Sequence, residues 1–145
     1  MVLTLRIECV GGAYLREHCV RVFEIRGDAT LDNLHWAIQH EVRFDGDHPY
    51  EFFIANSSSG AKRHHPSRNE DWEDMEKDFE AIKLAQVFPL GRKRLYYHFD
   101  FGDDWIFEIR KARGVKEPEA QVQYPRVIES IGPTPVQYPG VDESW

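Results

Sequence analysis

Leu95-Tyr-Tyr-His-Phe-Asp-Phe-Gly-Asp-Asp-Trp-Ile-Phe-Glu-Ile109 is the most regular stretch of the chain. Large side chains recur at every second position on both sides of its Gly-Asp-Asp segment, which is the period of strands with one buried face. Gly102, Asp103 and Asp104 tolerate the backbone angles that a tight reversal needs. The stretch therefore predicts a β-hairpin over about residues 93–111, placed at the centre of a sheet.

The length of the turn sets the register of this hairpin. A two-residue turn would put Trp105 on the face opposite the other large rings. A three- or five-residue loop would pair Phe101 with Trp105 and Phe99 with Phe107, which keeps every large ring on one face. We therefore predict the longer loop.

The composition indicates one soluble globular domain. The 145 residues, of which 41% are hydrophobic and 13% aromatic, suffice for one core and exclude disorder throughout. The first nine residues carry charges and no apolar run reaches membrane-spanning length, so we expect neither a signal peptide nor membrane contact. Two cysteines without an export signal indicate a cytoplasmic protein with free thiols, and Cys9 and Cys19 would lie opposite each other as small core residues.

Alternation and helical spacing place the remaining elements. We predict strands over 2–10, 19–25 and 50–55, helices over 31–42 and 71–82, and a short turn at 85–88, with an exposed loop over 56–69. Trp36 lies off the apolar stripe of the first helix, so that it either packs against a later loop or is exposed for contact, and we favour packing. This order fits an α+β domain, with helices on one face of a mixed sheet, as in the β-grasp plan.

Prolines dominate the chain from about residue 114, so that no central strand is expected there. This tail is predicted to wrap over the sheet, as part of a single domain over 1–145. Its expected anchors are Tyr124, Val127, Ile128, Ile131 and Tyr138.

Two motifs resemble a known family. Leu34-His35-Trp36-Ala37-Ile38-Gln39 and the Tyr97 to Trp105 stretch are similar to the Leu-His-x-x-Ile-Gln helix and Tyr-Asp-Phe-Gly-Asp-x-Trp hairpin of the plasmid pRiA4b ORF-3-like family. The resemblance runs over about 3–124. It implies no established activity, although some members are described as transposon passenger proteins or resolvases, and some are fused to DNA-binding domains. It therefore suggests a plasmid or mobile-element setting.

The tail departs from the family pattern. Tyr124-Pro125-Arg126 is kept, but Val127 stands near the position of the family's cysteine. Residues 131–135 replace an acidic Pro-Pro-Glu-Asp segment. No site built from the family's tail is therefore expected here.

The hairpin tip supplies the strongest polar constellation, formed by Asp100, Asp103, Asp104 and His98. Close carboxylates can bind a hard cation or serve in acid–base catalysis. Turn chemistry alone also explains Asp and Gly at these positions, and we favour that interpretation. His35 borders the helix stripe and could face the sheet near His98, whereas His64 and His65 are expected to be incidental surface residues.

Basic residues flank the hairpin at its other end. The predicted pairing gathers Arg92, Lys93, Arg94, Arg110, Lys111 and Arg113 at the open end, where they could bind phosphate or a nucleic-acid backbone. A solvated rim that keeps sheet edges apart is the plainer alternative. The net charge of −7 disfavours a dedicated nucleic-acid binder.

Three functional hypotheses follow, of which we favour the first. It is a non-enzymatic module that binds a protein partner through a sheet edge or an aromatic surface, without a cofactor or metal. The second is an ion site or hydrolytic site at the hairpin tip. The third is an accessory role in DNA transactions of a mobile element through the basic residues.

Overall fold

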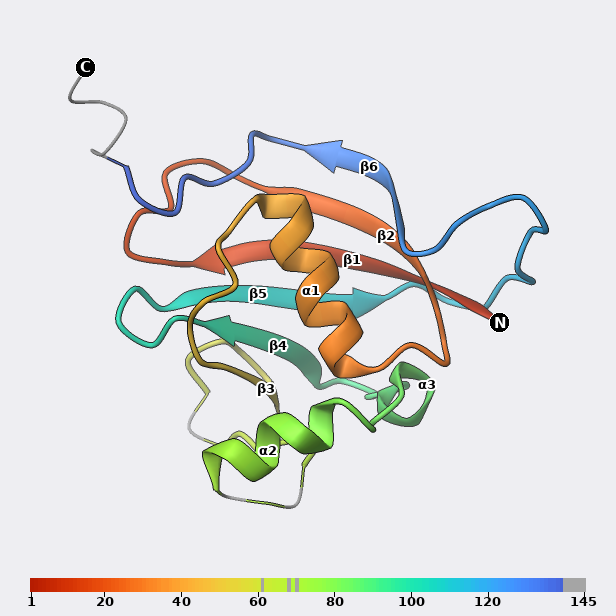
Figure 1. Cartoon of the computed structure of the whole chain (residues 1–145), viewed down its shortest axis with the longest axis horizontal. Helices are drawn as coiled ribbons and strands as arrows, with labels where there is room; N and C mark the ends of the chain where they lie inside the picture. The colour runs from red at the N-terminus through yellow and green to blue at the C-terminus, as the bar shows by residue number, and fades with distance from the viewer. Residues whose placement is uncertain (61, 68, 70, 140–145) are drawn as a thin grey trace.

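The computed structural model describes residues 1–60, 62–67, 69 and 71–139. Figure 1 shows the elements of this part of the chain, which in order are β1 (Val2–Gly11), β2 (Val20–Arg26), α1 (Leu31–Val42), β3 (Tyr50–Ala55), α2 (Trp72–Phe79), α3 (Leu84–Val87), β4 (Arg94–Phe99), β5 (Trp105–Lys111) and β6 (Arg126–Ile131). The α+β class is confirmed. The closer likeness to the β-grasp plan stays a prediction.

The strands form one sheet in the order β3-β4-β5-β1-β2-β6. All pairings between these described strands are antiparallel, so the expectation of a mixed sheet is wrong. The reason is the loop that follows α1, which carries the chain to the far edge of the sheet, so that β3 pairs with β4 and not with β2 (Figure 1). β5 and β1 form the middle pair of the sheet, and β4 lies one strand further out.

The β4–β5 hairpin is present, but its register differs by two positions from the predicted one. Phe99 pairs with Trp105 and Tyr97 with Phe107. The chain reverses over residues 100–104, and Phe101 within this turn is 41% exposed. The other rings keep their common face because a shift of two positions preserves the alternation of side chains.

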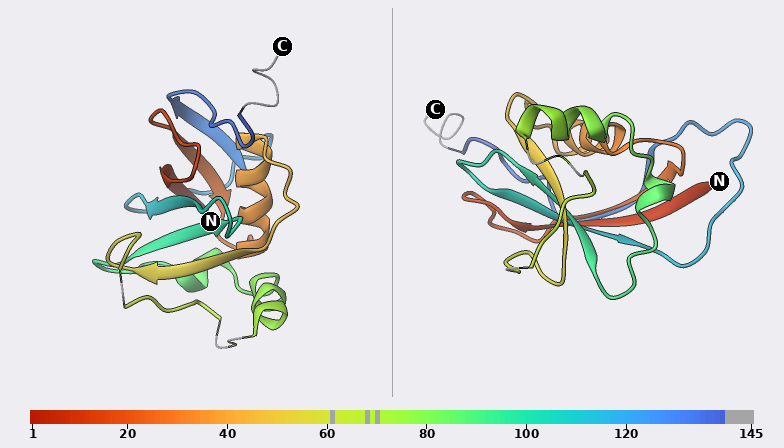
Figure 2. Two further views of the ribbon diagram at one scale, coloured as in Figure 1. Left: turned by 90° about the vertical axis from the view of Figure 1, so that its left-hand side faces the viewer. Right: turned by 90° about the horizontal axis from the view of Figure 1, so that it is seen from below.

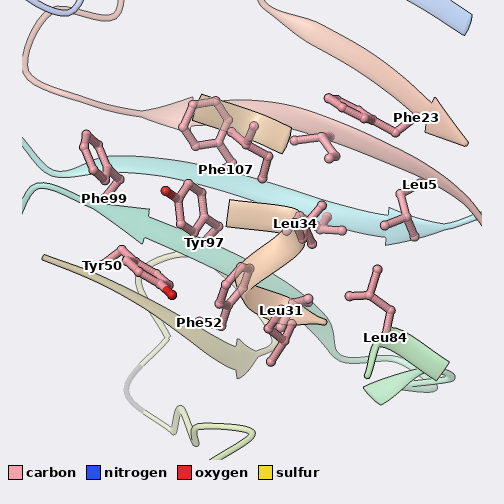
Figure 3. Close-up of a cluster of buried hydrophobic side chains, with 14 of the residues drawn as sticks. Leu5, Phe23, Leu31, Leu34, Tyr50, Phe52, Leu84, Tyr97, Phe99 and Phe107 are labelled. Carbon is pink, nitrogen blue, oxygen red and sulfur yellow. The ribbon is translucent and has the colours of Figure 1, made fainter. Parts of the chain in front are cut away.

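The helices cover one face of the sheet, as predicted (Figure 2). Thr30 caps α1, because its hydroxyl accepts the N–H of Asn33 at 3.1 Å while the Asn33 side chain accepts the N–H of Thr30 at 2.9 Å. Leu31 and Leu34 on α1 lie over a layer of rings from the strands (Figure 3). Burial of this apolar layer is the main stabilising contribution to the fold. The uncovered side is called the open face below.

Strand β6 is the element that the sequence analysis missed. It pairs with β2 at the edge of the sheet, and the prolines at 125 and 133 stand on either side of it rather than inside it. Val127 packs against the core as expected. Ile128 and Ile131 do not anchor the tail, because their side chains are 46% and 44% exposed.

Cys9 and Cys19 are neighbours on β1 and just before β2, as predicted. The Cys9 N–H donates to the Cys19 carbonyl at 3.0 Å, and both residues are buried with free thiols. Burial raises the pKa of the Cys9 thiol to about 12. Both residues therefore serve as small core side chains.

Candidate functional site

The hairpin turn separates the acidic side chains that the sequence analysis had grouped. Asp104 Oδ1 lies 2.7 Å from His98 Nε2 on the open face. Asp100 Oδ2 instead lies 3.7 Å from His48 Nε2, and the His48 ring packs against Phe99 on the helix-covered face. The structure thus brings His98 and Asp104 together but places Asp100 beside His48, because the turn points these two carboxylates to different neighbours.

Asp100 and Asp104 shape the turn itself. Both have left-handed backbone angles, with φ of 62° and 52°. Asp100 Oδ1 accepts the N–H groups of Gly102 at 3.1 Å and Asp103 at 3.4 Å, which is the behaviour of an aspartate that stabilises its own turn. The favoured turn interpretation is thus confirmed for Asp100.

His98 is bound by carboxylates at both ring nitrogens. Glu51 on β3 is its direct cross-strand partner, and His98 Nδ1 lies 2.8 Å from Glu51 Oε2. The other oxygen of Glu51 lies 2.6 Å from His65 Nε2. His65 is therefore not incidental, because it ties the 56–69 loop to the open face.

The ionisation of this cluster follows from its contacts. Burial lowers the pKa of His98, but the hydrogen bonds to Glu51 and Asp104 outweigh it and hold that pKa above its ordinary value. Burial raises the pKa of Glu51, but the hydrogen bonds from His98 and His65 outweigh it and lower that pKa. An imidazolium whose two N–H groups both donate to carboxylates has no lone pair for a general base.

A second polar cluster joins the tail to the loop before β3. Tyr138 OH donates to Asp45 Oδ2 at 2.9 Å and lies 2.7 Å from His48 Nε2. The Gln137 side chain accepts the N–H of Asp45 at 2.9 Å and donates to its carboxylate at 3.1 Å. Burial and the nearby Asp100 raise the pKa of Asp103, the acidic residue at the margin of this cluster. Tyr138 thus anchors the tail by hydrogen bonds rather than by apolar burial.

Neither cluster has the geometry of a metal centre. Among the residues that the structure describes, no group of three or more His, Cys, Asp or Glu side chains is placed to hold a metal ion. Carboxylates in both clusters are occupied by hydrogen-bond donors, which compete with a cation for the same oxygens.

His35 lies on the helix-covered face, so the expected approach of His35 to His98 is wrong. Its ring stacks on Tyr50 at 3.8 Å between centroids, and its Nδ1 is hydrogen-bonded to Tyr97 OH. Gln39 Nε2 donates to the same hydroxyl at 2.9 Å. Burial lowers the pKa of His35 to about 4, so the ring is neutral and accepts the proton of Tyr97. This network is internal to the core.

The predicted basic residues do come together. A surface groove of about 570 Å³ lies at the open end of the β4–β5 hairpin. We call it the basic groove, and its lining includes Arg92, Lys93, Arg94, Arg110, Lys111 and Arg113. Phe88, Pro89 and Leu90 complete one wall. The β4–β5 segments that contribute its cationic side chains lie at the end of the hairpin opposite its turn, near α3 (Figure 1).

Trp36 packs against a later loop, as predicted, and is also partly exposed. A Cβ atom at Gly46 in the loop after α1 would lie 2.7 Å from Trp36 Cζ3, yet the Trp36 side chain is 53% exposed. It lines two hollows of about 610 Å³ and 730 Å³, one extending to Phe44 and Thr134 and the other to Tyr124 and Pro125. The sequence indicates this exposure, because Trp36 lies off the apolar stripe of the helix.

Comparison with known proteins gives relatives without an assigned activity. An uncharacterized protein, y4hQ of Sinorhizobium fredii, is 28% identical over 106 residues, which are 72% of this chain and 50% of that protein. The chain thus spans half the length of this relative. The crystal structure of a protein of unknown function, MM3350 from Methanosarcina mazei Go1, is similar with a TM-score of 0.62 at 22% identity, over 89% of this chain and 68% of that one.

The structural likeness establishes the fold alone, and none of the described helices has the length and apolar character to cross a membrane. The match to a family model covers nearly the whole chain. The model for the plasmid pRiA4b ORF-3-like protein matches residues 3–140. This chain therefore belongs to the plasmid pRiA4b ORF-3-like family.

Proposed function

We propose that this domain is a non-enzymatic module that binds a protein partner through the surface around Trp36. One observation carries the proposal: Trp36 is 53% exposed and stands between two hollows. Tryptophan is enriched among the residues that dominate binding energy at interfaces, because it buries a large apolar area at small entropic cost.

The Trp36 surface combines parts of the chain that are distant in sequence. The hollow on one side is lined by Gln39, Phe44 and Thr134, and the other by Ala37 and the Tyr124–Pro125 pair. Helix α1, the loop after it and the tail thus meet around one aromatic ring. Such a surface can accept two apolar side chains of a partner, one on each side of Trp36.

The Trp36 side chain is held in place before a partner arrives. A Cβ atom at Gly46 would lie 2.7 Å from Trp36 Cζ3, so the indole packs directly on the backbone of the loop after α1. The indole also makes a T-shaped contact with the His35 ring, with 4.6 Å between centroids. A fixed anchor loses little conformational entropy on binding.

The charge of the chain supports a basic partner. The net charge of −7 attracts positively charged proteins at long range and raises the rate of encounter. We therefore propose a partner of net positive charge that inserts apolar side chains beside Trp36. The buried free thiols of Cys9 and Cys19 fit a cytosolic setting.

The rival proposal, a hydrolytic or ion site at residues 98–104, has less support. His98 is saturated by Glu51 and Asp104, and Asp100 is committed to its turn. A catalytic acid–base pair needs a group free to exchange a proton with substrate.

Site-specific crosslinking tests the proposal. A photoreactive amino acid at the exposed position of His40, which lines both hollows, should capture a basic protein in cells that contain the native partner. The captured protein is then purified, and its affinity is measured for the wild type and for Trp36→Ala. We expect Trp36→Ala to weaken binding by about tenfold or more.

Lys77 on α2 supplies the matched control, since it is exposed and outside the Trp36 surface. The same crosslinker at position 77 should not capture this protein, and Lys77→Ala should bind it as the wild type does. If every captured protein binds Trp36→Ala as tightly as the wild type, the proposal fails.

A further inference from the structure

We propose that the basic groove binds a compact ligand that carries two or more phosphoryl groups. This site is separate from the Trp36 surface, because the two share no lining residue. The inference therefore goes beyond the proposed function and does not depend on it.

The fold concentrates positive charge in the groove. Arg92 and Lys93 precede β4 and Arg94 begins it, while Arg110 and Lys111 end β5 and Arg113 follows it. The antiparallel pairing therefore brings both runs to one end of the hairpin. Six cationic side chains line the groove as a result. Phosphate oxygens are strong acceptors for such side chains, and arginine can bind them with two parallel hydrogen bonds.

Half of these cations have partners within the fold. Arg94 and Arg110 pair with Glu108, at 3.1 Å and 2.5 Å. Burial raises the pKa of Glu108, but the two arginines, Arg110 first, outweigh it and lower that pKa. The Lys111 ammonium donates to two backbone carbonyls, those of Ala112 and Gly114, each at 3.0 Å.

The other three cations, Arg92, Lys93 and Arg113, are exposed and have no side-chain ion pair within the described part of the chain. These three side chains are free to rearrange around a bound anion, so they are the residues on which we expect affinity to depend.

The rest of the chain limits the size of the ligand. Outside the groove, the remaining twelve basic residues stand against 25 acidic ones, a balance of −13. A long polyanion would extend beyond the groove and be repelled by this surface. A compact oligophosphate would interact with the groove alone.

The groove suits a small molecule in its dimensions. Its volume of about 570 Å³ lies within the range of roughly 300 to 1,000 Å³ typical of small-molecule sites. Phe88, Pro89 and Leu90 provide an apolar wall beside the cations. An organic oligophosphate, such as a nucleoside triphosphate, fits this combination better than inorganic phosphate alone.

Calorimetric titration of the full chain with sodium tripolyphosphate, ATP and a short DNA duplex tests the inference. We expect one site per chain for both small ligands, tighter binding of ATP than of tripolyphosphate, and weakening at about 0.15 M salt relative to low salt. The variant Arg92→Ala/Lys93→Ala/Arg113→Ala should bind about tenfold or more weakly.

The control variant is Lys62→Ala/Lys77→Ala/Lys83→Ala, which removes three exposed lysines outside the groove. Its net charge equals that of the triple groove variant. It should keep the wild-type affinity. Equal weakening in both variants would mean attraction by overall charge only, and would overturn the inference. Absence of binding to either small ligand, or tighter binding of the duplex, would also overturn it. Thermal unfolding checks that both variants fold. If the triple groove variant does not fold, the single variant Arg113→Ala takes its place.

Discussion

His98 and Glu51 are direct partners across β4 and β3, with 2.8 Å between His98 Nδ1 and Glu51 Oε2. Asp104 binds the other ring nitrogen at 2.7 Å. The imidazolium thus bridges a sheet strand and the hairpin turn, on the face that no helix covers. Its contribution is to hold the turn against the sheet, and that contribution depends on pH.

Replacing His98 with Gln should change how the free energy of unfolding depends on pH. The pKa of His98 in the folded chain is above its usual 6.5. Its stabilisation is therefore complete below about pH 6.5 and is lost as the pH rises through the folded pKa. As the pH rises through this range, the free energy of unfolding of the wild type should fall by about 1 kcal/mol relative to that of His98→Gln. Urea unfolding at a series of pH values measures this difference.

His64→Gln is the matched control. His64 is an exposed histidine of the 56–69 loop, and it has no ion pair among the described side chains. Its unfolding free energy should follow the wild-type pH dependence. Parallel curves for His98→Gln and the wild type would contradict the prediction.

His35 should act in the opposite direction and at lower pH. Its pKa is about 4 in the folded chain against 6.5 for a free histidine, so the unfolded chain takes up a proton that the folded chain refuses. Stability is lost as the pH falls from 6.5 towards 4, by about 3 kcal/mol at pH 4. The wild type should lose this amount relative to His35→Gln, and an NMR titration of the His35 ring should give its pKa directly. A ring that titrates near 6.5 in the folded protein would refute this account.

Helix α1 and the hairpin could be predicted because their side-chain periods are unambiguous. The register of the hairpin could not, because a slip of two residues leaves the same side chains on the same face. The left-handed backbone of Asp100 and Asp104 settles the turn, and residue types permit that conformation without requiring it. Phe101 was therefore assigned to the core although it is exposed.

The sites were harder to predict than the fold, because they depend on pairings between distant segments. Tyr97 and His98 are consecutive, yet one reaches His35 in the core and the other reaches Glu51 on the open face. Glu51 shares a face of β3 with Phe53, two residues further along, but this period does not identify its partner across the sheet. The basic groove was predictable, since it needs only the antiparallel path of one local hairpin.

Trp36 and Trp105 should differ sharply in their contributions to stability. Trp105 is completely buried in the core, whereas Trp36 is 53% exposed. Trp105→Ala should cost about 3 to 5 kcal/mol because it leaves a large cavity. Trp36→Ala should cost about 1 kcal/mol or less, since this half-exposed ring loses only its contacts with the loop at Gly46 and with the His35 ring. Urea unfolding of the two variants measures both values, and a cost above about 2 kcal/mol for Trp36→Ala would show that Trp36 serves the fold rather than binding.

Arg21 should control the attachment of β6 and the tail. Its guanidinium is buried on β2, where it lies 2.9 Å from Glu41 and donates to the carbonyls of Ile131 at 3.2 Å and Gly132 at 3.0 Å. Arg21→Lys keeps the charge, but one ammonium group cannot satisfy all these acceptors. We expect a loss of about 2 kcal/mol in the free energy of unfolding.

Hydrogen exchange should show where that loss occurs. Amides of β6 should exchange faster in Arg21→Lys, while those of the β4–β5 hairpin keep their protection, because Arg21 contacts the tail and not the hairpin. Arg6→Lys is the control, since Arg6 is half exposed on β1 and pairs with Glu8 at 2.8 Å at the surface. That change should cost less than about 0.5 kcal/mol. Equal costs for the two substitutions, or uniform exchange across the sheet in Arg21→Lys, would mean that β6 is held by its backbone pairing with β2 and not by the buried guanidinium.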